Sequence, residues 1–363
     1  MGQGPLKDLK VVEFAGIGPG PFCGMLLSDL GADVLRITRP DQPPPTRFEP
    51  SLRGRRSVAL DLKSPQGVET ALRFVDQAEA LFEGFRPGVM ERLGLGPDVV
   101  TARKPRIVYG RMTGWGQYGP RAHTAGHDIN YISLGGALHA IGPAERPIPP
   151  LNLVGDYGGG ALYLAFGMVS AVLSARATGV GQVVDCAMSD CAANLLAPFY
   201  GMFASGAWVN ARASNRLDGG APYYGCYACA DGKWISVGSL EKPFYELLLA
   251  RLGLSPTDYP HPLPHARWPA LNTALGTIFA SQPRDHWCAL LDETDACFAP
   301  VLDVTEAPQH PHNLARNTFI ELDGVLQPAP APRFSATPAA VAWPSAASGE
   351  AEGVYQDWGV TPA

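Results

Sequence analysis

Short apolar runs alternate with amphipathic stretches along the first part of the chain. Residues 9–14 form an apolar run that predicts a strand, and 33–37 form a second one. Between them, 22–30 predicts a helix that ends at Gly31. A helix between two strands so close in sequence makes a βαβ unit, whose strands are parallel. The chain therefore begins with part of a parallel sheet.

The same alternation continues downstream. Further strands are predicted at 58–62, 80–85, 107–111 and 182–186, and helices at 65–78 and near residues 90 and 99. This order is typical of an open, doubly wound α/β sheet, a Rossmann-like architecture that binds ligands at the carboxyl ends of its strands.

The pattern changes after three longer helices, predicted at 130–140, 157–177 and 189–205. An antiparallel hairpin is predicted from 223–228 and 233–237, around the turn residues Ala230-Asp231-Gly232. The remaining elements predict a smaller α+β domain, with helices at 242–252, 268–280 and 284–293 and a strand at 298–302.

These patterns predict two domains and two linkers. We expect a large α/β domain over 1–200, completed by 328–363, and a small α+β domain over 221–310. The linkers are then 201–220 and 311–327, and a last helix at 350–358 packs back on the large domain.

Composition narrows the classes of protein that fit. The chain of 363 residues is 46% hydrophobic and 17% charged, which is globular and excludes a disordered protein. Its net charge of −6, with no basic tail, makes nucleic acid an unexpected partner. The seven cysteines have no regular spacing and no zinc-site pattern, so we expect no metal site, reduced thiols and a cytoplasmic location.

One stretch is long and apolar enough to test for a membrane span. Residues 157–175 carry no formal charge but contain several glycines and serines, and Asp156 precedes them. A closely packed internal helix explains this composition better than lipid does, so we expect no membrane partner.

The turn after the first strand resembles a dinucleotide fingerprint but departs from it. Gly16 and Gly18 fit G-x-G-x-x-G, whereas the sixth position is Pro21, and no acidic residue follows for a ribose hydroxyl. The second strand ends with Arg36 and Arg39 instead. More arginines come near later strand ends, at Arg53, Arg55, Arg56, Arg86 and Arg92.

An arginine cluster at the carboxyl ends of parallel strands fits a phosphorylated nucleotide. An NADP-like ligand and the phosphorylated ADP group of coenzyme A both remain open at this point, as do ordinary solvated arginines.

Two residues are suited to proton transfer. His127 lies in a Gly-led turn before a helix, and Asp156 lies in a second such turn. Asp156 as a simple helix N-cap is one interpretation. The other is acid–base chemistry by a pair of proton carriers, with helix N–H groups near Asp156 stabilising an oxyanion.

Several separated motifs now resemble one family in order and spacing, over nearly the whole chain. They are Ala15-Gly-Ile-Gly-Pro-Gly-Pro21, Glu83-Gly-Phe-Arg-Pro-Gly88, Met112-Thr-Gly-Trp-Gly-Gln117, Gly126-His-Asp-Ile-Asn-Tyr131 and Pro150-Leu-Asn-Leu-Val-Gly-Asp156. With these motifs the chain resembles the family III (CaiB/BaiF) CoA-transferases, and within them the racemase branch, which acts in lipid and fatty acid metabolism.

This resemblance implies a reaction and its residues. The reaction is inversion at C2 of a 2-methyl-branched acyl-CoA thioester by transfer of the α-proton through an enolate, without metal or redox cofactor. His127 would serve the (S) side and Asp156 the (R) side, and Glu241 would orient the histidine. Coenzyme A is then part of the substrate.

The resemblance also implies the residues that bind coenzyme A. Arg39 would meet a nucleotide phosphate and Leu60 to Lys63 the adenine, although Leu60 stands where relatives can have a smaller residue. The whole implied set is Arg39, Leu60, Asp61, Leu62, Lys63, Gly84, Phe85, Arg86, Arg92, Gly126, His127, Asp128, Ile129, Asn130 and Tyr131.

The resemblance further implies an interlocked homodimer, with each site between the large domain of one chain and the small domain of the other. Two other functions remain open on the sequence. They are a family III CoA-transferase with Asp156 as nucleophile and a non-catalytic acyl-CoA- or nucleotide-binding protein. The broken Gly fingerprint excludes an NADP oxidoreductase. The acyl chain of the substrate is not determined.

Overall fold

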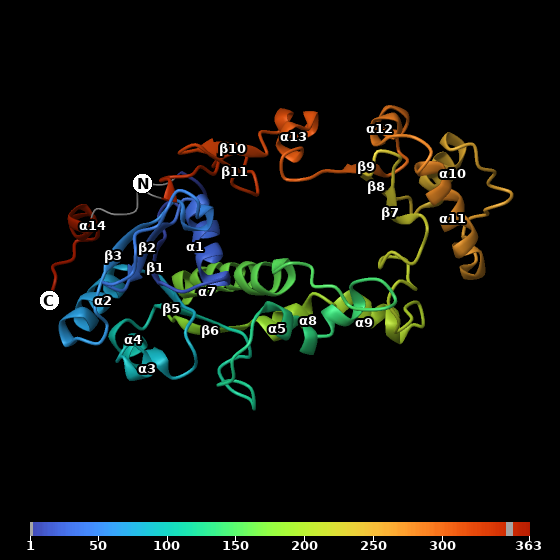
Figure 1. Cartoon of the computed structure of the whole chain (residues 1–363). Helices are drawn as coiled ribbons and strands as arrows, with labels where there is room; N and C mark the ends of the chain where they lie inside the picture. The colour runs from blue at the N-terminus through green and yellow to red at the C-terminus, as the bar shows by residue number, and fades with distance from the viewer. Residues whose placement is uncertain (1–2, 346–350) are drawn as a thin grey trace. The chain divides into compact units, whose positions relative to one another are not determined.

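The computed structural model describes residues 3–345 and 351–363, and the chain forms two compact units (Figure 1). The large unit comprises 1–136, 150–196 and 317–363, and the small unit comprises 137–149 and 197–316. Residues 1–2 and 346–350 lie outside the described part of the chain, and residue 350 is the first of the predicted last helix.

A six-stranded sheet forms the centre of the large unit. Its strand order is β3-β2-β1-β4-β5-β6, and all five neighbouring pairs are parallel. The order reverses between β1 and β4, as in a doubly wound fold, so the predicted fold class is confirmed. The strands are Lys10–Phe14 (β1), Asp33–Thr38 (β2), Arg56–Ala59 (β3), Ala80–Glu83 (β4), Val108–Thr113 (β5) and Gln182–Ala187 (β6).

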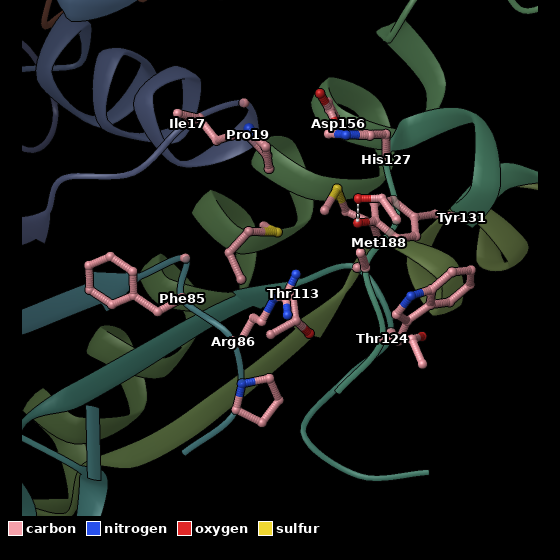
Figure 2. A pocket seen from close by; sticks show the side chains of 18 of the residues that line it. Ile17, Pro19, Phe85, Arg86, Thr113, Thr124, His127, Tyr131, Asp156 and Met188 are labelled. Carbon is pink, nitrogen blue, oxygen red and sulfur yellow. Dashed lines mark hydrogen bonds between the residues drawn. The ribbon is translucent and has the colours of Figure 1, made fainter. Parts of the chain in front are cut away.

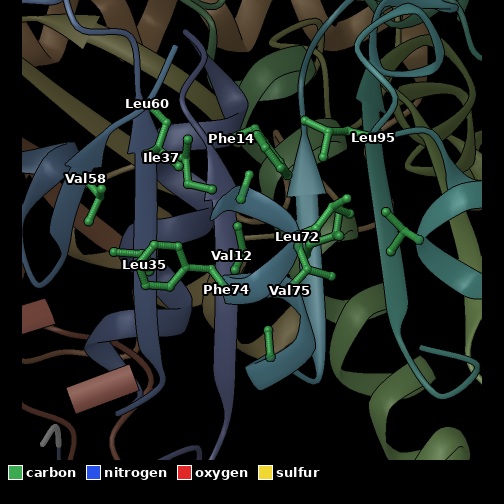
Figure 3. Packing of buried hydrophobic residues seen from close by; sticks show 14 of the residues in the cluster. Val12, Phe14, Leu35, Ile37, Val58, Leu60, Leu72, Phe74, Val75 and Leu95 are labelled. Atoms are coloured by element: carbon green, nitrogen blue, oxygen red, sulfur yellow. The ribbon is translucent and has the colours of Figure 1, made fainter. Parts of the chain in front are cut away.

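Helices cover both faces of this sheet, because its strands carry apolar side chains on both sides. On one face the core includes side chains of α1 and α7, and on the other it includes side chains of α2, α4 and α14. Figure 3 shows Phe74 and Val75 of α2 among the strand residues Val12 and Leu35. The helices of the large unit are Pro19–Asp29 (α1), Pro65–Gln77 (α2), Val89–Arg92 (α3), Pro97–Arg103 (α4), Asp128–Leu134 (α5), Tyr163–Thr178 (α7), Met188–Asn194 (α8) and Ala351–Trp358 (α14), with a 3-10 turn at Pro50–Leu52.

The last helix packs back on the large unit, as predicted. Val354 and Trp358 of α14 are buried in the same core as Phe74, and the Trp358 ring meets that of Phe74 edge-on, with centroids 5.8 Å apart. The chain end is also held, since the Ala363 N–H donates to the Thr70 hydroxyl at 3.0 Å.

The long helices that the sequence predicts differ from those of the structure, and a glycine divides one of them. The predicted helix at 130–140 is divided into α5 and Ala137–Ala140 (α6), because Gly136 between them has φ +89°. The predicted helix at 157–177 begins earlier, as a π-helix over Leu153–Leu162, and continues as α7. The predicted helix at 189–205 is likewise two helices, α8 and Ala197–Ala204 (α9).

The combined stretch Leu153–Thr178 is, by length and composition, able to cross a membrane. In the structure α7 packs on β5 and β6, and its buried side chains Leu164, Met168 and Val172 belong to the core of the large unit. One face of this stretch therefore packs in the core of the large unit, as the composition predicts.

The small unit is an α+β structure around a three-stranded antiparallel sheet, which confirms the predicted change from a parallel to an antiparallel sheet. The predicted hairpin is present, with Gly232 at φ +77° in its turn. Its elements are Tyr224–Ala228 (β7), Trp234–Gly238 (β8), Lys242–Arg251 (α10), Trp268–Phe279 (α11), Arg284–Leu291 (α12), Phe298–Val301 (β9) and Pro311–Ala315 (α13), with 3-10 turns at His265–Arg267 and Ala307–Gln309.

The limits of the two units differ from the predicted domain limits, and residues 197–220, predicted as the end of the large domain and a linker, belong to the small unit. Residues 137–149 join the small unit, because the Arg212 guanidinium donates to the carbonyls of His139 and Pro143 at 2.9 and 3.1 Å. Residues 317–327 form no linker but belong to the large unit, with an antiparallel hairpin of Phe319–Leu322 (β10) and Val325–Pro328 (β11). Asp323 and Gly324, which both have positive φ, form its turn. The Asp-Gly dipeptide is a hairpin signal in the sequence that the linker prediction overlooked.

Buried ion pairs hold α1 on the sheet. Glu13 of β1 is fully buried, and one of its carboxylate oxygens is 2.5 Å from Arg55 Nη1. Asp29 at the end of α1 pairs with buried Arg53 at 2.6 Å. Arg53 also donates to Gln327 at 2.8 Å, which ties the β10–β11 hairpin to this helix.

The glycine in the middle of α1 leaves room for the buried pair. A Cβ at Gly24 would lie 2.6 Å from the Glu13 carboxylate and closer still to the Arg55 guanidinium. We therefore expect Gly24→Ala to lower the free energy of unfolding by about 2 kcal/mol or more, measured by urea denaturation. Gly20→Ala in the same helix is the control, because nothing lies within 4 Å of its added Cβ. Equal stability of the two variants would contradict this account.

Candidate active site

Loops that follow β1, β4 and β5 meet the π-helix at a cavity of about 330 Å³ in the large unit (Figure 2). His127 and Asp156 lie at the same side of this cavity in Figure 2. The cavity is lined by Ile17, Gly18, Pro19, Gly84, Phe85, Arg86, Pro87, Met112, Thr113, Gly114, Trp115, Ala122, Thr124, Ala125, Gly126, His127, Tyr131, Asp156 and Met188.

Asp156 is held by two hydrogen bonds. Its backbone N–H donates to Asp128 Oδ1 at 2.8 Å, and its own Oδ2 accepts from Asn152 Nδ2 at 3.1 Å. The expectation that Asp156 caps a helix is wrong, because it lies inside the π-helix that begins at Leu153. The Asp156 N–H is also already bound to Asp128, so it is not free to stabilise an oxyanion.

Glycines around Asp156 are required by close packing. A Cβ at Gly155 would lie 2.8 Å from Asp128 Cγ and would overlap its Oδ1. A Cβ at Gly159 would lie 3.1 Å from Ala192 N of α8, and one at Gly160 would lie 3.0 Å from Pro19 of α1. The glycine run therefore lets the π-helix approach α1 and α8, and this fixes the position of Asp156.

Burial of the Asp156 carboxyl raises its pKa above the ordinary value for aspartate. The hydrogen bond from Asn152 lowers this pKa, the charge of Asp128 raises it, and the nearby His127 lowers it. The carboxyl thus accepts a proton more readily than an exposed aspartate does, which suits a group that takes and returns protons.

His127 stands at the start of α5, next to the same cavity. It is the N-cap residue, and its backbone N–H donates to Asn130 Oδ1 at 3.0 Å. The side chain of His127 is exposed, and its charge acts on Asp156 through space. Two proton carriers therefore lie at one end of a cavity, as acid–base chemistry requires.

Two aromatic rings support the wall beside His127. Trp115 and Tyr131 meet edge-on with centroids 4.8 Å apart, and the Tyr131 hydroxyl donates to the Gly126 carbonyl. A Cβ at Gly126 would lie 2.7 Å from the Tyr131 ring and 3.1 Å from the Trp115 ring. Only glycine fits before His127, so these rings set the path of the backbone into α5.

A second cavity, of about 740 Å³, lies in the same unit and shares part of its wall with the first. Both cavities are lined by Ile17 and Gly18 after β1 and by Gly84 and Phe85 after β4. Arg39, Gln42 and Glu49 line only the larger one. The two cavities together suit an elongated ligand with a polar end at Arg39 and a reacting end at Asp156.

Glu83 holds the loop that both cavities share, and the sequence analysis gave it no role. Its carboxylate accepts from the Phe85 N–H at 2.7 Å and from Arg111 Nε at 3.0 Å. Arg111 also binds Glu91 at 2.8 Å. Burial raises the pKa of Glu83 to about 7, although the Phe85 N–H and Arg111 oppose this shift. The parallel register that pairs Glu83 with Arg111 depends on strand pairing, which no local pattern shows.

The structure brings together only part of the predicted binding set. Gly84, Phe85, Arg86, Gly126, His127 and Tyr131 line the smaller cavity, and Arg39, Leu62, Gly84 and Phe85 line the larger. Asp128 is buried and accepts a hydrogen bond from the Asp156 N–H. The predicted residues that line neither of these cavities are Leu60, Asp61, Lys63, Arg92, Asp128, Ile129 and Asn130.

Two of the predicted site residues line neither cavity and lie in other parts of the structure. Leu60 is a buried residue of the hydrophobic core, so its side chain does not face the larger cavity. Glu241 is the exposed N-cap residue of α10 in the small unit.

The predicted arginine cluster is corrected in a similar way. Arg53 and Arg55 are buried in pairs with Asp29 and Glu13, and Arg56 pairs with Asp357 at 2.5 Å. These three guanidinium groups serve the fold. Over residues 3–345 and 351–363, no group of three or more His, Cys, Asp or Glu side chains lies together as a metal site would require.

Comparison with known proteins gives one consistent result. Residues 6–351 match CoA-transferase family III. The chain is 44% identical over 337 residues to the alpha-methylacyl-CoA racemase of Mus musculus, covering 92% of this chain and 87% of that protein. It is 41% identical over 338 residues to the alpha-methylacyl-CoA racemase of Homo sapiens, with the same coverage. A crystal structure of a CAIB/BAIF family protein from Brucella suis matches with a TM-score of 0.79 and 26% identity, covering 98% and 100% of the two chains.

The hydrogen bond from Asn152 to Asp156 generates a prediction. Because this bond stabilises the charged carboxylate, Asn152→Leu should raise the pKa of Asp156 further above its ordinary value. Titration of the ¹³C-labelled aspartate side chains by NMR measures it. Asn313→Leu, which removes a hydrogen-bonded amide of the small unit, should leave it unchanged. An unchanged or lower pKa of Asp156 in Asn152→Leu would contradict this prediction.

Proposed function

This chain belongs to CoA-transferase family III, and on that basis we propose that it is an isomerase that inverts C2 of 2-methyl-branched acyl-CoA thioesters. The observation that carries the proposal is the pair His127 and Asp156 at one end of a cavity, in a chain 44% and 41% identical to two alpha-methylacyl-CoA racemases. Such a reaction belongs to lipid metabolism, and coenzyme A is part of the substrate.

Inversion requires that the α-proton leave one face of C2 and that a proton return to the other. His127 takes the proton of the (S) substrate while Asp156, protonated, donates to the opposite face. The (R) substrate reacts in the reverse sense. Because its pKa is raised, the Asp156 carboxyl is protonated, and so able to donate a proton, more readily than the carboxyl of an ordinary aspartate. We also propose that Glu241 orients His127, as the family resemblance implies.

The two cavities divide the substrate between them. The nucleotide of coenzyme A occupies the larger cavity, with Arg39 at a phosphate, and the thioester reaches the smaller one past Gly84 and Phe85. Arg86 lines the smaller of the two cavities, and it contacts the pantetheine arm of coenzyme A.

We expect the protein to incorporate solvent deuterium at C2 and to convert either enantiomer of a 2-methylacyl-CoA into a near-equal mixture. Incubation in D₂O, followed by mass spectrometry and chiral analysis, measures both. Acyl or CoA transfer to a free acid without α-exchange would instead establish the alternative, in which the Asp156 carboxylate is the nucleophile. Binding of acyl-CoA with neither reaction would indicate a non-catalytic protein.

Variants of the two bases test the assignment of faces. His127→Ala should reduce racemisation from both enantiomers by on the order of 10²–10⁴-fold, because the two directions share one equilibrium constant. It should still exchange the α-proton of the (R) substrate through Asp156, and lose exchange with the (S) substrate. Asp156→Asn should show the reverse. Equal residual exchange of both enantiomers in both variants would exclude one base per face.

We further propose a homodimer in the cytoplasm rather than a membrane protein. Leu162, Phe166 and Leu173 of the long apolar stretch are 52%, 74% and 64% exposed in the single chain. A second copy of the chain that covers these side chains explains their composition without lipid. All seven cysteines are free, which fits a reducing compartment.

Phe166→Asp should therefore shift the protein from a dimer toward a monomer of 38.5 kDa, because a carboxylate would be buried in the contact. Light scattering after gel filtration, over a dilution series, measures this. Val99→Asp on α4, 46% exposed in the single chain, is the control for added surface charge. A parent protein that is monomeric, or that sediments with lipid vesicles, would overturn the proposal.

A further inference from the structure

A buried guanidinium lies in the wall of the larger cavity without a full set of partners. Arg36 of β2 is only 5% exposed, yet it lines this cavity. Its ion pair with Glu13 is long, at 3.5 Å, and its buried Nε has no hydrogen-bond partner among the residues that the structure describes. Buried charges are normally paired and hydrogen-bonded, so Arg36 is an exception that needs a cause.

Arg36 and Arg55 share one buried carboxylate, that of Glu13, and the exposed Glu49 also favours the charge of Arg36 through space. Glu13 lies between two guanidinium groups, and Arg55 holds it at the shorter distance of 2.5 Å. Burial lowers the pKa of Arg36, as expected for a cation with too few partners. Glu49, at the exposed rim of the same cavity, accepts hydrogen bonds from the Thr46 N–H and hydroxyl at 2.7 and 3.0 Å.

A second feature of the same wall favours an anion. The turn of Gly16 to Gly18, which leads into α1, lines the cavity, and the first turn of this helix contains no acidic residue. The amino end of a helix carries a partial positive charge, although in α1 the prolines Pro19 and Pro21 leave only Gly20 with an N–H among the first three residues. Arg36 and this helix end face one cavity from two different elements.

We infer that Arg36 binds the diphosphate of coenzyme A, so that the anionic ligand completes its partners; this inference rests on the proposed acyl-CoA substrate. The position of Arg36 favours the diphosphate over the 3′-phosphate. The Arg39 side chain, just after the same strand, is 77% exposed. Arg36 lies deeper in the same cavity, whose wall also includes Gly84 and Phe85, the residues shared with the smaller cavity. Within coenzyme A, the diphosphate likewise lies between the adenosine 3′-phosphate and the pantetheine arm.

Calorimetric binding to the full-length protein separates the two arginines. Arg36→Met should weaken coenzyme A and 3′-dephospho-coenzyme A alike, by roughly ten-fold or more, and should weaken ADP as well. It should leave pantetheine, which has no phosphate, unaffected. Arg39→Ala is the matched control, which should weaken coenzyme A much more than 3′-dephospho-coenzyme A.

A merely structural role for Arg36 would give a different pattern. If Arg36→Met bound coenzyme A within two-fold of the parent protein, or weakened pantetheine as much as ADP, the inference would be overturned. Arg36→Lys keeps the charge and tests the same point where Arg36→Met does not fold. It should keep more affinity for ADP than Arg36→Gln, and equal affinities would argue against a phosphate contact. Because binding is measured, absence of racemisation would count against the proposed function and not against this contact.

Discussion

The reversal of strand order between β1 and β4 is the constraint on which the rest of the structure depends. Parallel strands on either side of this point send their following chain to opposite faces of the sheet, which leaves room between the loops at the carboxyl edge. Both cavities lie there, and their shared wall comes from the loops after these two strands, at Gly18 and Gly84. The position of the site thus follows from topology, and its chemistry follows from the side chains that the loops carry.

Buried ion pairs keep that edge in place. Glu13 with Arg55 lies beneath α1, and Glu83 with Arg111 lies beneath the Gly84–Phe85 loop. Each pair joins segments distant in sequence, and each removes charges from water, a cost that close hydrogen bonds offset. Arg36 differs from Arg55 and Arg111 because its own contact with a carboxylate is long. The same residue type therefore serves the fold at most of these positions and a ligand at the one left incompletely paired.

The environment of Asp156 links packing to reactivity. Consecutive glycines allow a π-helix to lie against its neighbours, and this places a carboxyl group where burial raises its pKa and where Asn152 and Asp128 hold it. His127 reaches the same cavity from the start of a separate helix. A pair of proton carriers from two independent elements can hold opposite faces of one carbon, which a pair on one helix turn could not easily do.

The sequence by itself determined the parallel α/β unit, the small antiparallel unit and the returning C-terminal helix, because apolar periodicity and Gly or Pro boundaries are local signals. Its motifs also indicated His127 and Asp156. Only the tertiary structure decided that Leu60 faces the core, that the Asp156 N–H is taken by Asp128, and which arginines are held in close buried ion pairs. These outcomes depend on through-space distances between residues far apart in the chain, and no local pattern of residues encodes such distances.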